Sequence, residues 1–124
     1  MVEFALASTI FLLLVLGTFD IARAYLAYTV VANVAREASR YGAAHANDPL
    51  FQPTDAITKA GLNLAIGIDT SVLSLTGTTT TLPGLTYSYF KVSGTYRFHS
   101  LTPLVGALMG DPIIILVNTS ALVG

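Results

Sequence analysis

Few residues in this chain have side chains suited to catalysis or metal binding, and they are widely separated. The 124 residues include no cysteine, which excludes disulfides, thiol nucleophiles and cysteine-bound metals. The two histidines, His45 and His99, have no neighbouring carboxylate pattern, and the chain has no glycine-rich phosphate loop, HExxH or GxSxG motif. We therefore expect no catalytic residue, no metal, no cofactor and no enzymatic activity.

Glu3 is the titratable residue with the most informative position. It immediately precedes the uncharged stretch Phe4–Phe19, FALASTIFLLLVLGTF, and burying a lone carboxylate costs several kcal/mol unless a cation meets it. In one interpretation, Glu3 stays in the headgroup region of a membrane and favours the positive end of a helix. In the other, it pairs with a positive charge on the next subunit, most simply a free N-terminal amine, and sets the axial step between stacked helices. Both interpretations remain open.

The composition indicates that much apolar surface must be covered by something other than the chain itself. Hydrophobic residues make up 53% and charged residues 10% of the sequence, against a usual charged share of about 25%. The mean hydropathy is +0.68. A membrane or other subunits are the natural cover for such a surface. The net charge of −1 gives no reason to expect nucleic acid as a partner.

The apolar stretch is long enough to reach across a membrane. With Met1 and Val2 it extends to about 18 residues, at the lower edge of the roughly 20 that span a bilayer. No basic residue precedes it, and the helical pattern continues after it. We therefore expect the segment to be retained rather than removed as a secretory signal peptide.

The helix is expected to continue well beyond this stretch. Small and apolar side chains recur at three- and four-residue steps, at Ala24, Ala27, Val31, Val34, Ala38 and Tyr41. Asp20 and Arg23 are three residues apart and are placed to form an ion pair. Although Gly42 is a candidate stop, we place the helix end near Ala46, before a proline-containing turn. A helix over residues 2–46 is on the order of 65 Å long.

After the long helix, the pattern predicts a second helix and a first strand. The short helix runs from Ala56 to about Ile66, with Thr54 or Asp55 as its N-terminal cap. A short strand is expected over Ser71–Thr76.

The strongest strand pattern lies in the second half of the chain. Gly77–Gly84 is expected to be a turn or loop, and Leu85–His99 a strand. The apolar positions change parity between Tyr89 and Phe90, which predicts a β-bulge there. Ser100–Gly110 is expected to hold one or two helical turns.

The last strand is expected over Ile113–Val123, and the sum is an α+β fold. A long N-terminal hydrophobic helix (about 2–46) is followed by a short helix and a small antiparallel sheet of three to four strands. We divide the chain into the N-terminal helix, 1–46, and a β-rich globular domain, 47–124. The helix is expected to span a membrane before assembly and to form a filament core afterwards.

Two short patterns are candidate glycosylation sites. Asn118-Thr119-Ser120 fits the N-glycosylation sequon, and Thr78, Thr79, Thr80 and Thr81 are candidates for O-linked sugar. Matches this short are weak, and ordinary strand and loop residues are the simpler interpretation.

Three stretches that contain polar residues carry a family resemblance: Val2-Glu3-Phe4-Ala5-Leu6, Asp20-Ile21-Ala22-Arg23 and Ala35-Arg36-Glu37-Ala38-Ser39-Arg40. Together with the apolar run, they closely resemble the start of TadE-like proteins. These are pseudopilins of the tight-adherence (Flp) branch of the type IV pilus superfamily. A weaker likeness continues through Val92–Phe98 and Leu101–Leu104. The resemblance is specific because a plain hydrophobic helix lacks these polar residues.

The resemblance implies a pilin-like fold and a precursor that a prepilin peptidase trims. It also implies a protein held in the cytoplasmic (inner) membrane until an assembly ATPase and platform extract it into a helical filament. Glu3 matches the family glutamate near the mature N-terminus. That glutamate commonly stands fifth in the mature chain, whereas Glu3 is third, so either residues precede Met1 or the processing site differs.

We therefore expect a structural subunit that polymerises through its N-terminal helix into an extracellular filament at the cell surface, with a role in cell adhesion. The expected contacts between identical subunits are made by Glu3, Phe4, Leu6, Ile10, Phe11, Leu13, Leu14, Leu16, Phe19, Asp20 and Arg23. Two alternatives are kept. One is a minor TadE-like pseudopilin that primes or tips a pilus, and the other is a single-pass membrane protein with a periplasmic binding domain.

Overall fold

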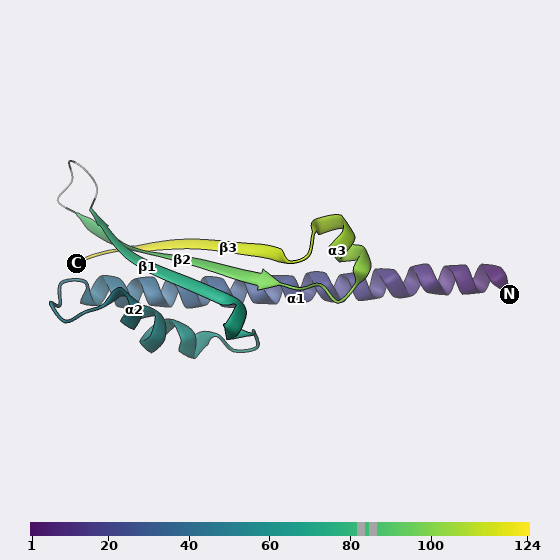
Figure 1. Cartoon of the computed structure of the whole chain (residues 1–124), viewed down its shortest axis with the longest axis horizontal. Helices are drawn as coiled ribbons and strands as arrows, with labels where there is room; N and C mark the ends of the chain where they lie inside the picture. Colours follow the sequence, from purple (N-terminus) through teal and green to yellow (C-terminus); the bar gives the residue numbers. More distant parts are fainter. Residues whose placement is uncertain (82–83, 85–86) are drawn as a thin grey trace.

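A long helix, α1 (Val2–His45), organises the molecule: its first half projects alone, and its second half carries the other elements (Figure 1). The computed structural model describes residues 1–81, 84 and 87–124. The strands β1 (Leu73–Thr81), β2 (Ser88–Phe98) and β3 (Ile113–Leu122) form an antiparallel sheet in the order β1-β2-β3. A short helix, α3 (Pro103–Met109), joins β2 to β3. The predicted α+β architecture is confirmed.

The predicted extent of α1 is confirmed to within a residue at its C-terminal end. Leucine and alanine dominate its sequence and favour the helix, and the chain leaves the helix at Ala46, shortly before Pro49. Within the described residues 1–81, burial along α1 begins only at Asp20. The two halves of the helix therefore have different surroundings: the first is largely exposed as far as Phe19, with Val105 of α3 close to Gly17, and the second belongs to a packed core.

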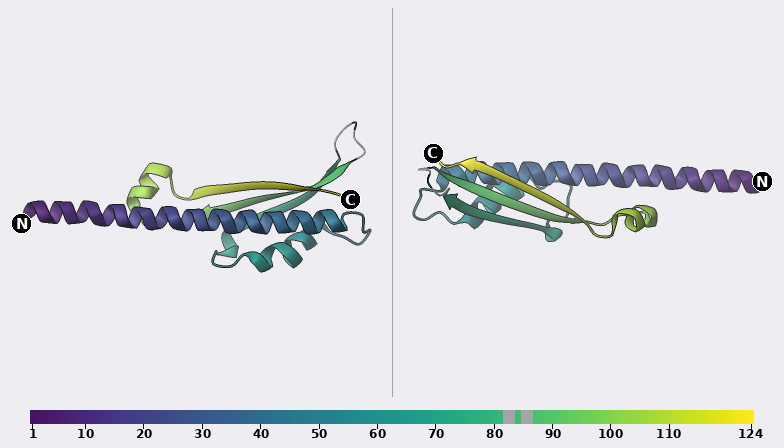
Figure 2. Two further views of the ribbon diagram at one scale, coloured as in Figure 1. Left: turned by 180° about the vertical axis from the view of Figure 1, so that it is seen from behind. Right: turned by 90° about the horizontal axis from the view of Figure 1, so that it is seen from above.

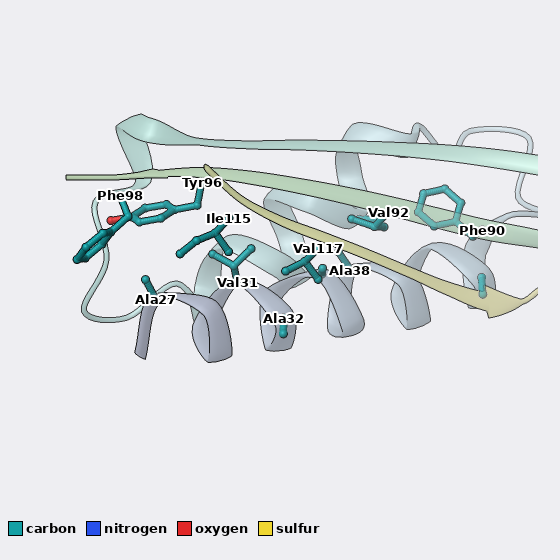
Figure 3. Close-up of a cluster of buried hydrophobic side chains, with 13 residues drawn as sticks. Ala27, Val31, Ala32, Ala38, Phe90, Val92, Tyr96, Phe98, Ile115 and Val117 are labelled. Carbon is teal, nitrogen blue, oxygen red and sulfur yellow. The ribbon is translucent and has the colours of Figure 1, made fainter. Parts of the chain in front are cut away.

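The sheet lies along the second half of α1, and the core fills the space between them (Figure 3). Val31, fully buried on the helix, faces the sheet near Val117 on β3. Val34 is also fully buried but packs against the second helical segment, with its Cγ1 atom 3.3 Å from where a Cβ on Gly61 would lie. The stripe predicted from helical spacing is confirmed, since each of its members is buried or half-buried. Because α1 and the sheet share one core, the packing joins both sides of the sequence division proposed after residue 46.

Phe90 is the largest fully buried side chain, and two glycines make room for its ring. A Cβ atom on Gly42 would overlap the ring, and a Cβ on Gly77 would lie 2.8 Å from the Phe90 Cζ atom. Phe51 packs edge-on against the same ring, with 5.8 Å between the ring centroids. Gly42 therefore lies inside α1, as the placement of the helix end near Ala46 predicted, and it serves close packing.

A second helical segment packs against another side of α1 (Figures 1 and 2). It starts with α2 (Pro53–Asp55) and continues as a π-helical turn, Ala56–Gly61, and a 3-10 turn, Leu62–Leu64. The segment begins three residues earlier than predicted because Pro53 fits the first helical position, where its fixed φ is favourable. The predicted side-chain cap from Thr54 or Asp55 is absent from this described segment.

The strand boundaries correct two predictions. The segment Gly77–Thr81, predicted as part of a loop, belongs to β1 and pairs with β2 up to Thr81 opposite Ser88. The register of β2 is regular against both neighbours, so the bulge predicted between Tyr89 and Phe90 was wrong. Tyr89 lies on the face of the sheet away from α1, and Phe90 lies on the face toward it. The predicted strand start at Leu85 lies outside the described residues.

Candidate functional site

The apolar surface of the first half of α1 is the dominant feature of the molecule, and we call residues Phe4–Phe19 the apolar rod. Figure 2 shows it extending away from the sheet and the second helical segment. Most of the predicted contact residues on it have between 49% and 80% of their side-chain surface exposed: Phe4, Leu6, Ile10, Phe11, Leu14, Leu16 and Phe19. Leu13 is half-buried. A surface this apolar is typical of a segment covered by lipid or by protein.

The rod is compatible with a membrane on both sequence and structural grounds. Within the described residues, α1 is long and apolar enough to cross a bilayer, by length and composition. The hydroxyl groups of Ser8 and Thr9 donate hydrogen bonds to the Ala5 carbonyl, and the Thr18 hydroxyl donates to the Leu14 carbonyl. The polar side chains of the rod are therefore satisfied within the helix, so lipid can surround it at low cost.

Glu3 lies exposed in the first turn of α1, before the rod. Among the ion pairs of the described residues, none involves Glu3. Its carboxylate is near the positive end of the helix dipole and free to meet an external cation. The structure thus leaves both sequence interpretations of Glu3 open.

The opposite end of the rod is fixed to the rest of the chain through Asp20, which is 1% exposed. Its carboxylate accepts hydrogen bonds from the backbone N–H of Leu101 (3.1 Å) and of Thr102 (2.7 Å), and from the Thr102 hydroxyl. The predicted ion pair with Arg23 is present, at 3.4 Å. We call these four residues the Asp20 junction.

Arg23 links the junction to the core. Its guanidinium lies 5.3 Å from the centroid of the Phe98 ring, a cation–π contact at the end of β2. Asp20 and Arg23 were predicted as contacts between subunits, a role that stays a prediction. Within the subunit, Asp20 is already enclosed by its own chain.

Hydrogen bonding holds the pKa of Asp20 below its usual range. The Thr102 hydroxyl contributes most; the Leu101 and Thr102 N–H groups and the Arg23 charge act in the same direction, and burial opposes them. The carboxylate therefore stays ionised at the outer end of the rod.

The lowered pKa of Asp20 predicts a loss of stability in acid. As the pH falls through the ordinary Asp value of about 3.8, the unfolded chain takes up the proton before the folded chain does. We expect the unfolding midpoint in detergent to be flat from about pH 7 to pH 5 and to fall below about pH 4. The fall should be shallower in Asp20→Asn.

Asp69→Asn is a second variant for the same pH series, because it removes a carboxylate of lowered pKa that lies outside the Asp20 junction. The pKa of Asp69 is also lowered, because its carboxylate accepts hydrogen bonds from the Ser71 side chain and from the Ser71 backbone N–H. Asp69 lies far from the rod along the chain, at the entry to β1. An acid transition identical in the native chain and in Asp20→Asn would contradict the role given to the junction.

The remaining candidate residues lie on the surface of the sheet domain. Asn118 is exposed on β3, as are Thr78, Thr79 and Thr81 on β1, while Thr80 is half-buried. Their glycosylation stays a prediction. His99 is paired with Asp111 at 3.1 Å, a carboxylate neighbour that sequence reasoning missed because it is 12 residues away. In the described part of the chain, His, Asp and Glu side chains form no group of three or more placed to hold a metal.

Sequence reasoning also missed Thr102, the principal partner of Asp20. The two residues are 82 positions apart, and no periodic pattern connects them. Pro103 after Thr102 indicated a helix start, but gave no sign of what the free N–H groups before it would bind.

Comparison with known proteins gives a family match at the start of the chain. The family model described as TadE-like protein matches residues 1–40, which contain the rod, Asp20 and Arg23. This confirms the resemblance on which the sequence interpretation was based. The family match, together with the N-terminal apolar helix, indicates a protein associated with the tight-adherence pilus. Neither the curated proteins nor the solved structures provide a significant match.

Proposed function

We propose that this chain, whose first 40 residues match the TadE-like family, is a structural subunit that polymerises through α1 into an extracellular filament. The observation that carries the proposal is the contrast within α1. The second half of the helix is packed against its own sheet, whereas the rod is left largely exposed. Such a rod needs a partner in every environment that the protein occupies.

Lipid is the partner before assembly, and the rods of other copies are the partner afterwards. Moving from lipid to a protein bundle exchanges one apolar contact for another, so the exchange itself costs little. Once the rod is outside the membrane, water is the competing environment. Covering a face of roughly 400 Å² then stabilises each subunit by about 10 kcal/mol at about 25 cal/mol per Å².

This function places the protein first in the cytoplasmic membrane and then in a cell-surface pilus. A prepilin peptidase and the pilus assembly machinery are the proposed partners, together with identical copies of the chain. We propose a non-catalytic role and no cofactor. The sheet domain, which packs on the second half of α1, would then form the outside of the filament.

A minor pseudopilin that primes or tips a pilus is the second candidate. The family match supports it, because TadE-like proteins are often minor components. The two candidates differ in amount: a filament-forming subunit is the main component of sheared surface material, whereas a priming or tip subunit is a trace component. Electron microscopy and mass analysis of that material separate them.

Glu3→Gln tests the assembly step without placing a new charge in the membrane. If Glu3 pairs with the amine of a neighbouring copy, we expect the ratio of sheared to membrane-bound protein to fall about tenfold or more, equivalent to about 1.4 kcal/mol per subunit. Glu37→Gln, an exposed glutamate on the same helix, is the matched control. An unchanged ratio in Glu3→Gln would assign Glu3 to the headgroup interpretation. Sheared material without the chain would overturn the proposed function.

A further inference from the structure

A second apolar surface lies where the sheet domain approaches the rod. The segment from Ser100 to Gly110 contains no charged residue. Four of its large hydrophobic side chains are exposed, with Leu108 the most exposed at 77%, and we call them the apolar foot: Leu101, Leu104, Leu108 and Met109. Figures 1 and 2 show α3 beyond the end of the sheet, displaced toward the free half of α1.

Contacts with α1 fix the height of the foot along the rod. The N–H groups of Leu101 and Thr102, just before α3, donate to the Asp20 carboxylate. The Val105 side chain approaches Gly17, with Cγ2 at 3.8 Å from where a Cβ atom would lie. The foot is therefore level with the outer end of the rod, where a membrane holding the rod would meet water.

We propose that the apolar foot inserts into the outer leaflet of the membrane, at the boundary between headgroups and acyl chains, while the chain awaits assembly. This inference rests on the membrane-bound stage of the proposed function and goes beyond it. The helix that carries the foot approaches the rod at Gly17, through Val105. The apolar face of a helix that lies in this layer is buried about 5–10 Å into it.

Three observations favour lipid as the occupant. The apolar run of about 18 residues is about 27 Å long, slightly less than the roughly 30 Å of a hydrocarbon core, so apolar surface beside its outer end reduces the mismatch. Asp20 at this level is enclosed by the junction and exposes almost no carboxylate to lipid. Tyr25 and Tyr28, one and two turns further along α1, are exposed, as aromatic residues at a membrane interface are.

The chain contains no tryptophan, so a single introduced tryptophan reports on its own surroundings. Full-length Leu108→Trp is reconstituted into vesicles of phosphatidylethanolamine and phosphatidylglycerol, with and without lipids brominated on their acyl chains. Phe11→Trp in the rod is the positive control. Leu116→Trp, at a 67% exposed site on the sheet, is the negative control. Each of these sites is exposed in the monomer, so circular dichroism should show an unchanged fold.

We expect brominated lipid to quench Leu108→Trp several-fold more than Leu116→Trp. Equal, weak quenching of these two variants, with Phe11→Trp strongly quenched, would overturn the inference and leave membrane anchoring intact. Blue-shifted but unquenched emission from Leu108→Trp that depends on the protein-to-lipid ratio would assign the foot to a second copy, and would also overturn it. Weak quenching of Phe11→Trp would instead contradict the membrane-bound stage itself.

Discussion

Replacing Phe90 with alanine is expected to lower the free energy of unfolding by about 3–5 kcal/mol, the usual cost of removing a buried aromatic ring. The ring is fully buried between α1 and β1, with Gly42 and Gly77 against it. Glycines cannot extend side chains into the space that the ring leaves, so the cavity collapses poorly. Chemical denaturation in detergent, followed by circular dichroism, measures the change.

Two further substitutions show whether the packing of Phe90 causes the expected loss of unfolding free energy. Leu116→Ala, on the opposite face of the sheet, should change the free energy of unfolding by no more than about 0.5 kcal/mol. Gly42→Ala should destabilise the native chain, because overpacking at about 1–3 kcal/mol outweighs a gain of about 1 kcal/mol in helix propensity. In a Phe90→Ala background the same change should become favourable. If the changes in free energy of unfolding caused by Gly42→Ala and Phe90→Ala simply add, the two residues do not pack against each other in this way.

Replacing Leu13 with aspartate is expected to abolish filaments. Leu13 lies near the middle of the rod, where an aspartate in apolar surroundings costs about 3 kcal/mol or more. The cost applies in lipid as well, but packed rods add repulsion between the carboxylates of neighbouring copies, which a single rod in lipid does not have. We expect the ratio of sheared to membrane-bound protein to fall about a hundredfold or more, equivalent to about 2.8 kcal/mol per subunit; using the ratio corrects for any loss of membrane insertion.

Leu50→Asp is the matched control for this experiment. Leu50 is 86% exposed in the turn after α1, far from the rod, and the same change of residue type should leave the ratio unaltered. Filaments of normal number in Leu13→Asp would show that the rod is not the assembly surface. Loss of filaments in both variants would point to a general effect of added charge.

The features that sequence reasoning predicted well are those set by local periodicity. The stripe from Ala24 to Tyr41 follows a helical repeat, and the alternation from Phe90 to Phe98 follows a strand repeat, so each pattern determines which face is buried. The rod was identified by a continuous run of apolar residues, which is also a local signal. These signals depend on neighbours within a few positions, which the chain order supplies directly.

The features that it missed depend on tertiary contacts. The run from Gly77 to Thr81 has four consecutive threonines and no alternation, yet it forms a strand because β2 lies beside it. Gly42 resembles a helix stop, and its role becomes visible only once the Phe90 ring is placed against it. The sequence identified Asp20 as a polar residue of the long helix and as a partner of Arg23. Its other partner, Thr102, reaches it only because β2 runs back along α1.

Photo-crosslinking from within the rod tests most directly whether rods pack against one another in a filament. p-Benzoylphenylalanine is placed at Phe11, a 65% exposed aromatic position, and sheared surface material is irradiated and separated by mass. The proposed function predicts a ladder of self-adducts that rises in steps of 13.1 kDa, the mass of one chain. Material containing the chain but giving no adduct, or an adduct only with a different, smaller subunit, would contradict it.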